Sequence, residues 1–308
     1  MIQFVQNPYL TEENVEKEKG IIGQEIQMYD DDPNWQLFFG LVNSLYGGHA
    51  ITKDIAGTIE SISEITPEVL YQCYNTFYDT SNMVLCVCGD VDPYEVLEII
   101  KEDTKEQKVF SEIDRFYGEE KDEINKDKIE KSMDVSMPLF SLGFKDLFNK
   151  EKLKAGLPGE LNETIKHDIA MQIALELIAG DGTKLYEDLY NSGLLNKELS
   201  TEFSAEEDYA FSQISGESND PYKVIATILD KISELKINGL DEEEFQRTKK
   251  VLYGRFVRSF EDVSTIANMF INDFFRGVNS AFYVVFSSSS RYLALKSSLE
   301  LKPSLVNR

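Results

Sequence analysis

The stretch LTEENVEKEK at residues 10–19 has a similar counterpart, LDEEEFQRTK, at residues 240–249. Each copy begins with a small polar residue suited to a helix N-cap and continues with acidic residues, which the helix dipole favours in the first turn. The match extends to the apolar pairs Ile21-Ile22 and Val251-Leu252, at the same offset of 230 positions. We therefore predict two copies of one structural unit, each with a long helix.

The two copies differ in charge. Glu18 aligns with Thr248, and Glu25 aligns with Arg255. Glu18 and Glu25 are seven residues apart, so they share one face of the helix, about two turns from each other. Such a pair is most often a solvated charged face. The isoleucines beside them predict instead a partly buried helix, in which a carboxylate needs a metal ion or a hydrogen-bond donor.

The repeat also predicts the domain organisation. The second copy follows a long leading segment, whereas the first copy begins almost at Met1, so we expect the first unit to lack its leading half. The predicted fold class is α+β, with tandem related α/β-sandwich domains in which helices pack an antiparallel-rich sheet. The first domain is represented by its second half only. The expected divisions are a first domain at 1–105, an acidic linker at 106–131, an incomplete second domain at 132–277 and an atypical tail at 278–308.

Hydrophobic periodicity and capping residues predict the elements. In the first domain we expect helices at 11–29, 34–45, 66–78 and 92–101, and a buried strand at 83–88. In the second we expect a strand at 132–144, a glycine-rich loop at 156–159, a helix at 167–179, two strands within 199–216, and helices at 221–236 and 241–258. The basic, serine-rich end is either a flexible native tail or the product of a reading-frame change near Val278.

Composition excludes several classes of protein. The formal net charge of −24 over 308 residues disfavours nucleic-acid binding, because a polyanion would be repelled, and is consistent with simple solubility. No apolar run reaches the length of a membrane span, and no signal peptide is recognisable, so we expect a cytoplasmic protein. Cys73, Cys86 and Cys88 lack metal-site spacing, and the last two are expected to be small buried side chains of one strand face.

The stretch EKGIIGQEI at residues 18–26 resembles the Glu-x6-Glu helix of the insulinase/pitrilysin family, zinc peptidases with an inverted His-x-x-Glu-His motif. Several other stretches agree with this family, and the similarity extends over about residues 1–277. It is closest to the small bacterial, processing-peptidase-like branch. The agreeing stretches include LYGGH at 45–49, GTIESI at 57–62, residues 82–90 and GTKLY at 182–186.

The resemblance implies that Glu25 is the third zinc ligand and that Glu18 is an outer carboxylate that orients the site. A catalytic zinc ion needs three protein ligands and an open position for water. The family's two histidines and catalytic glutamate lie about 75 residues upstream of the ligand glutamate, and this stretch is absent here. His49, predicted in a loop, and His167, predicted at the start of a helix, do not fit the motif. We therefore expect the chain to retain no zinc and to be inactive alone.

The resemblance also implies an altered substrate site. Active relatives carry an arginine and a tyrosine that anchor the peptide and the tetrahedral intermediate, and the matching positions here are Tyr190 and Asn196. The first hypothesis is a homologue of a zinc metallopeptidase that lacks half of its site. The second is a noncatalytic partner subunit or peptide-binding scaffold of an active homologue, and the third is a gene fragment. Expected partners are a peptide or a homologous peptidase subunit, in a possible homo- or hetero-oligomer, with no nucleic acid and no membrane.

Overall fold

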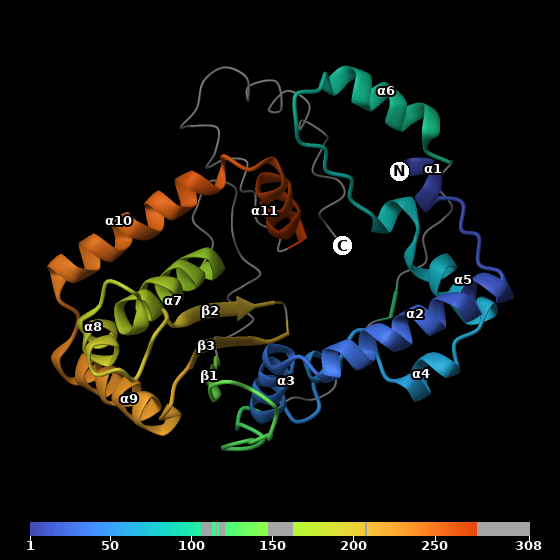
Figure 1. Cartoon of the computed structure of the whole chain (residues 1–308). Coiled ribbons are helices and arrows are strands. Elements are labelled where there is room, and N and C mark those ends of the chain that lie inside the picture. Colours follow the sequence, from blue (N-terminus) through green and yellow to red (C-terminus); the bar gives the residue numbers. More distant parts are fainter. Residues whose placement is uncertain (106–112, 115, 117–120, 147–162, 207, 276–308) are drawn as a thin grey trace.

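The computed structural model describes residues 1–105, 113–114, 116, 121–146, 163–206 and 208–275 (Figure 1). The predicted glycine-rich loop at 156–159, the tail at 278–308, linker residues 106–112, 115 and 117–120, and Glu207 lie outside these ranges. Within the described ranges, every helix is too short or too polar to span a bilayer.

The first part of the chain is helical. Its helices are α1 Ile2–Val5, α2 Glu12–Asp30, α3 Pro33–Leu45, η1 Ala50–Thr52, α4 Ile59–Ser63, α5 Pro67–Phe77, η2 Thr80–Asn82 and α6 Pro93–Asp103. Several of the longer helices in the chain begin with a capping residue followed by proline, whose fixed φ suits the first helical position. The cap and proline pairs are Asp32-Pro33, Thr66-Pro67, Asp92-Pro93 and Asp220-Pro221.

The second part contains a three-stranded antiparallel sheet in the order β1-β3-β2. Its elements are β1 Leu139–Lys145, α7 Glu163–Ala179, α8 Lys184–Asn191, β2 Ser200–Ala205, β3 Ala210–Glu217, α9 Pro221–Asn238, α10 Glu242–Ser259 and α11 Val263–Phe275. In the register, Leu139 pairs with Glu217 and Ser200 pairs with Ser215. The predicted α+β class, with helices packed on an antiparallel sheet, is confirmed.

The internal repeat is confirmed at the level of structure. Shifting α2 and α3 by 230 positions superimposes their bounds on those of α10 and α11 to within one residue. The caps agree as well: the side chain of Thr11 accepts a hydrogen bond from the backbone N–H of Asn14, and Asp241 accepts one from Glu244. Both copies are therefore a long capped helix, a short turn and a second helix.

Two strand predictions differ from the structure. Residues 83–88 form no strand, and Val84 and Val87 are 37% and 46% exposed, so the prediction of a buried strand is wrong. The apolar run is suited to a sheet, but the described residues offer it no neighbouring strand, and a strand requires a ladder of hydrogen bonds. The strand predicted at 132–144 is shorter and begins at Leu139.

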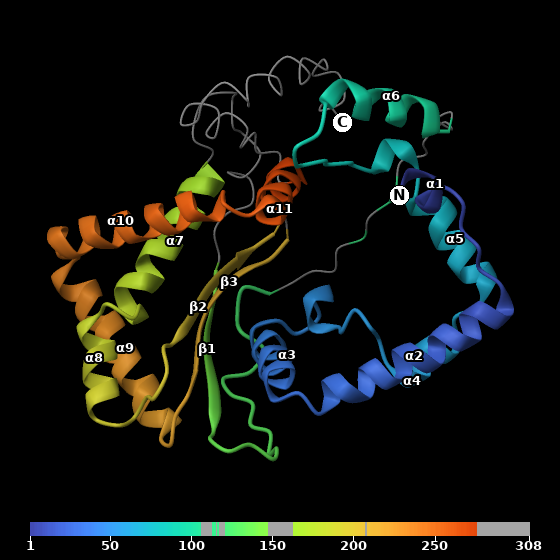
Figure 2. The ribbon, with the colours of Figure 1, turned by 45° about the horizontal axis from the view of Figure 1, so that its top comes forward.

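Helices cover both faces of the sheet, and α3 provides the cover on one of them (Figure 2). Phe211 and Ile214 are three residues apart on β3, so their side chains point to opposite faces. Ile214 packs in a core with α7, α8 and α9, whereas Phe211 packs with the α3 residues Leu41 and Leu45. One face of the three-stranded sheet is therefore covered by a helix of the first repeat.

The segment before β1 runs along α3 and ties it to its neighbours. The backbone N–H of Asn125 donates to the Ser44 carbonyl at 2.9 Å, and the Lys131 ammonium donates to the Gln36 amide oxygen at 2.8 Å. The Lys128 ammonium donates to the hydroxyl of Tyr222, at the start of α9, at 2.6 Å. The described end of the predicted linker is thus attached to both parts of the chain.

Gly143 of β1 is where α3 comes closest to the sheet. A Cβ atom at this position would lie 3.2 Å from Leu45 Cδ1 and still closer to Leu41 Cδ1. We expect Gly143→Ala to lower the free energy of unfolding by about 1–3 kcal/mol, the usual cost of overpacking a core. Urea unfolding followed by circular dichroism measures this change.

Gly254 of α10 is the matched control for Gly143. A Cβ atom there would meet nothing within 4 Å. Because alanine restricts the unfolded chain and favours helix, Gly254→Ala should raise the free energy of unfolding by about 0.5–1 kcal/mol. An equal loss of stability in both variants would contradict close packing at Gly143.

Candidate functional site

Helix α2 places Glu18 and Glu25 on one face, two turns apart, as predicted. Both residues are exposed, and Val15 is the one buried residue of this helix. The expectation that burial makes the carboxylates need a donor or a metal ion is therefore wrong for the residues the structure describes. The reason is that no described helix or strand lies over their side of α2, so water can solvate both carboxylates.

The side chains near Glu25 do not fit a zinc site. Across the described ranges, no three histidine, cysteine, aspartate or glutamate side chains come together in a group able to hold a metal ion. One carboxylate cannot supply the three protein ligands of a catalytic zinc ion. The roles of Glu25 as ligand and Glu18 as outer carboxylate stay predictions that require residues from elsewhere.

In the second repeat, a partner helix buries one position of the equivalent face. Helix α10 packs against α7, and Thr248, which aligns with Glu18, is only 5% exposed. Arg255, which aligns with Glu25, donates from its two terminal nitrogens to the two oxygens of Glu176 at 2.7 and 3.1 Å. The hydrogen bond to Glu176 raises the pKa of Arg255. An ion pair thus joins the two helices where the first repeat carries a lone carboxylate.

Sequence reasoning missed Glu176. The presence of Arg255 where the first copy has Glu25 could have predicted an acidic partner, because arginine forms strong hydrogen bonds with carboxylates. The position of that partner 79 residues upstream, on α7, follows only from the packing of α7 on α10.

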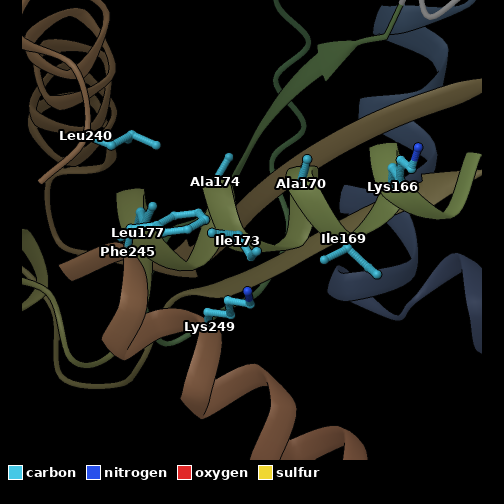
Figure 3. A pocket seen from close by; sticks show the side chains of 9 residues that line it. All are labelled: Lys166, Ile169, Ala170, Ile173, Ala174, Leu177, Leu240, Phe245 and Lys249. Atoms are coloured by element: carbon cyan, nitrogen blue, oxygen red, sulfur yellow. The ribbon is translucent and has the colours of Figure 1, made fainter. Parts of the chain in front are cut away.

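A groove of about 380 Å³ lies between α7 and α10 (Figure 3). Its wall is mainly apolar, with Ile173 and Leu177 on α7 facing Phe245 on α10, and Lys166 and Lys249 are its charged residues. Among the described residues, the groove lining contains no carboxylate, imidazole or thiol, so it offers none of the side chains that usually hold a zinc ion.

Both histidines pair with aspartates near one end of the sheet. His49 Nδ1 accepts from the backbone N–H of Ile51, and its Nε2 lies 2.9 Å from Asp208 Oδ2. Its predicted loop position is confirmed. His167 lies within α7, which begins earlier at Glu163, so the prediction that it opens the helix is wrong. Its Nε2 is 2.7 Å from Asp146 Oδ2.

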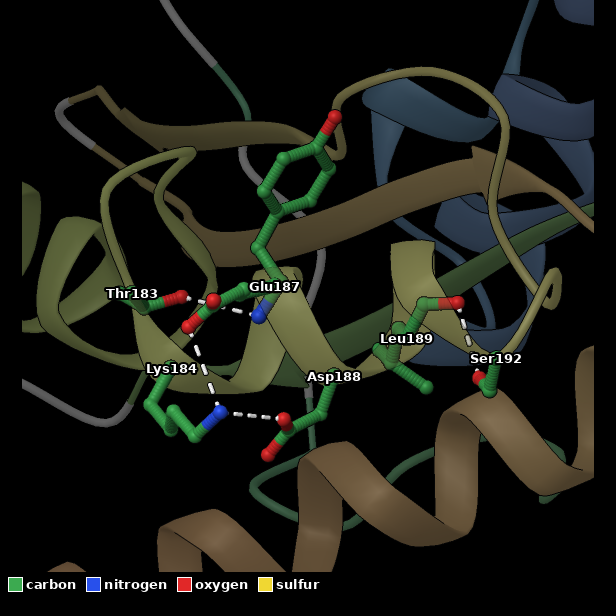
Figure 4. A network of polar contacts seen from close by, with 7 residues as sticks. Thr183, Lys184, Glu187, Asp188, Leu189 and Ser192 are labelled. Atoms are coloured by element: carbon green, nitrogen blue, oxygen red, sulfur yellow. Dashed lines mark hydrogen bonds and ion pairs between the residues drawn. The ribbon is translucent and has the colours of Figure 1, made fainter.

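The two altered anchor positions are exposed. Tyr190, 53% exposed, is in the last turn of α8, and Asn196 is in the exposed turn that leads to β2. Local polar contacts define the two ends of α8: Thr183 caps its start, and the Ser192 hydroxyl donates to the Leu189 carbonyl at its end (Figure 4). Both views of the ribbon place α8 far from α2, so the described structure does not bring Tyr190 close to Glu25 (Figures 1 and 2).

The cysteines differ from expectation in burial. Cys73 is exposed, and Cys86 and Cys88 are half-buried rather than buried in a strand. Burial, with a further contribution from Cys88, raises the pKa of the Cys86 thiol. A thiol with a raised pKa stays protonated near neutral pH and is a poor nucleophile or metal ligand.

A family model described as the Peptidase M16 inactive domain matches residues 64–252, well over half of the chain. The chain belongs to the M16 peptidase family. This bears out the resemblance to the insulinase/pitrilysin zinc peptidases that the Glu-x6-Glu helix indicates.

Two relatives of this M16 chain come from Bacillus subtilis (strain 168). "Uncharacterized zinc protease YmfH" is 38% identical over 275 residues, which are 88% of this chain and 61% of the relative. "Uncharacterized zinc protease YmxG" is 24% identical over 258 residues, which are 82% of this chain and 58% of the relative. The M16 chain thus spans about three fifths of the length of these relatives.

Solved structures agree with the fold of the M16 chain. An M16-like peptidase from Alicyclobacillus acidocaldarius is 32% identical with a TM-score of 0.80, and the match covers 89% of this chain and 63% of that one. A peptidase M16 inactive domain from Pseudomonas fluorescens has a TM-score of 0.67 at 16% identity, covering 98% of this chain and 67% of that one, a likeness of fold alone.

Proposed function

We propose that this chain is part of an M16 zinc metallopeptidase and is inactive by itself. In the complete enzyme, zinc-activated water would hydrolyse peptide bonds, with Glu25 as one ligand and Glu18 orienting the site. The observation that carries this proposal is an exposed Glu25 that belongs to no group of three metal-binding side chains among the described residues, in a chain whose relatives are named zinc proteases. The missing ligands would come from a His-x-x-Glu-His segment.

Zinc content and hydrolysis test this proposal. The purified chain should hold far less than one zinc ion per molecule by elemental analysis, because a single carboxylate binds the ion weakly. It should also show no chelator-sensitive cleavage of a quenched fluorogenic peptide library. Glu25→Ala and the control Glu13→Ala should both leave these results unchanged. One tightly held zinc ion per chain, lost in Glu25→Ala and kept in Glu13→Ala, would show that the site is complete.

A noncatalytic role is the second candidate, and the anchor positions favour it. Tyr190 and Asn196 stand where active relatives of the family carry arginine and tyrosine, and both are exposed enough to contact a peptide. A tyrosine can donate a hydrogen bond but supplies no positive charge. The chain would then bind a peptide, or serve as a cytoplasmic partner subunit of an active homologue. Co-purification should recover that homologue, and a monodisperse chain without a companion would count against this role.

A further inference from the structure

We propose that the groove between α7 and α10 binds a small amphiphile, a molecule with a straight aliphatic chain and a carboxylate head group. The aliphatic chain lies along the apolar wall that α7 provides, and the carboxylate pairs with the ammonium of Lys249 on α10 (Figure 3). The proposed peptidase function makes no use of this groove, so the two proposals are tested separately.

One face of α7 forms the apolar wall of the groove. Its members are spaced four residues apart in two rows, which places them on the same side of the helix. The rows are Ile169, Ile173 and Leu177, and Ala170 and Ala174. From Ile169 to Leu177 the wall is about 12 Å long, at the helical rise of about 1.5 Å per residue. An extended aliphatic chain can follow a wall of this length.

The groove has a buried floor and an open rim. Ile173 and Leu177 are 8% and 6% exposed, and Phe245 on α10 lines the groove with them. At the rim, Ile169 and Leu240 are 45% and 56% exposed. An aliphatic chain in the groove removes this exposed apolar surface from water, which favours binding.

The size of the groove favours a small molecule over a protein partner. Its volume of about 380 Å³ lies within the range of ligand sites, about 300–1,000 Å³. Nine described residues line it, whereas a stable protein interface uses about 20–30 residues on each side. An apolar wall with few polar groups is also typical of small-molecule sites, in which the polar groups fix the orientation of the ligand.

Charge selects the head group. Among the described lining residues, Lys166 and Lys249 carry charge, and both are positive. Lys249 is exposed, makes no ion pair with another described residue, and has no acidic residue three or four positions away on α10. Lys101 and Lys184, in contrast, pair with carboxylates at these spacings. The ammonium of Lys249 is therefore available to an anionic head group.

A preference for a carboxylate runs against the overall charge of the chain. The formal net charge of −24 attracts small cations and repels small anions over most of the surface. If an anionic amphiphile binds more tightly than a cationic one with the same aliphatic chain, the difference must come from local positive charge. This contrast distinguishes the groove from nonspecific adsorption to exposed apolar side chains.

Isothermal titration calorimetry of the complete 308-residue chain with sodium decanoate, below the concentration at which it forms micelles, tests the proposal. We expect saturable one-to-one binding with a Kd below about 1 mM. Decyltrimethylammonium, with the same aliphatic chain and the opposite charge, should bind at least about tenfold more weakly. Octanoate should bind about two- to fourfold more weakly for each methylene group that it lacks.

Variants of the groove locate the binding. Lys249→Glu should weaken decanoate binding by about tenfold or more, because it places a carboxylate beside the head group. Lys250→Glu makes the same change of charge one position along α10, outside the groove lining, and should leave the Kd within about twofold. Ala170→Leu should also weaken binding, because the larger side chain occupies the groove. Its helix content by circular dichroism should stay unchanged, because Ala170 is exposed and leucine suits a helix.

Several outcomes would overturn the inference. They are no saturation below the micelle-forming concentration, equal or tighter binding of decyltrimethylammonium, and equal losses in Lys249→Glu and Lys250→Glu. Unchanged binding by a folded Ala170→Leu chain would place the ligand elsewhere and contradict it as well. Sedimentation with phosphatidylglycerol vesicles separates a free amphiphile from a lipid surface. The chain should stay in the supernatant, and pelleting that Lys249→Glu abolishes would assign the groove to a membrane instead, against the proposal.

Discussion

Replacing Phe211 by alanine should lower the free energy of unfolding by about 3–5 kcal/mol, the usual cost of removing a buried aromatic ring. Phe211 is 1% exposed and lies between the sheet and α3, where it packs with Leu45 and forms an edge-on contact with Tyr46. Its loss leaves a cavity where α3 of the first repeat meets the three-stranded sheet. Chemical denaturation measures the change.

Hydrogen exchange shows whether Phe211→Ala loosens the contact between α3 and the sheet or destabilises the whole chain evenly. Hydrogen exchange in Phe211→Ala should rise first in α3 and in residues 121–131, which are attached to it. Phe4→Ala is the control, because Phe4 is 85% exposed and its removal should change the stability by less than about 0.5 kcal/mol. Unchanged exchange in α3 would show that its docking does not depend on Phe211.

Arg255→Glu should destabilise the packing of α7 on α10 by about 2–3 kcal/mol. The substitution places a carboxylate beside Glu176, whose side chain is 13% exposed, and near Asp181. Removing one partner of a buried ion pair costs about 3–5 kcal/mol, and the expected value is smaller because the Arg255 side chain is 51% exposed. Urea unfolding of the complete chain measures it.

Two further variants supply the controls for this prediction. The double variant Glu176→Arg with Arg255→Glu restores opposite charges and should recover at least half of the lost free energy of unfolding. Lys250→Glu makes an equal change of charge at an exposed position of α10 and should lower the free energy of unfolding by less than about 0.5 kcal/mol. A double variant no more stable than Arg255→Glu would contradict a specific pair between the helices.

Much of the helical structure could be predicted because its signals are local. A capping residue with proline behind it set the start of α5 at Pro67 and of α6 at Pro93, and the starts of α2 and α10 follow from Thr11 and Asp241. These signals act through hydrogen bonds within a single turn. The antiparallel pair β2–β3 was also within reach, because its strands are adjacent along the chain.

The failures share one physical cause, which is dependence on distant residues. Residues 83–88 have the composition of a buried strand and remain exposed, because composition does not supply a neighbouring strand. The carboxylates of α2 were predicted to be partly buried because isoleucines lie beside them, but those neighbours do not determine whether another element covers the helix. His167 was predicted to open a helix, but α7 begins four residues earlier, and its pairing with Asp146 depends on packing between separate elements.

By itself, the sequence determined the repeat, the approximate bounds of most of the longer helices, the absence of the two carboxylates from the second copy and the family that the Glu-x6-Glu helix indicates. The tertiary structure alone decided that α3 covers one face of the three-stranded sheet, that Glu176 pairs with Arg255 and that the acidic face of α2 is open to solvent. Helix signals are carried by neighbouring residues, whereas burial and pairing depend on which surfaces meet across the fold.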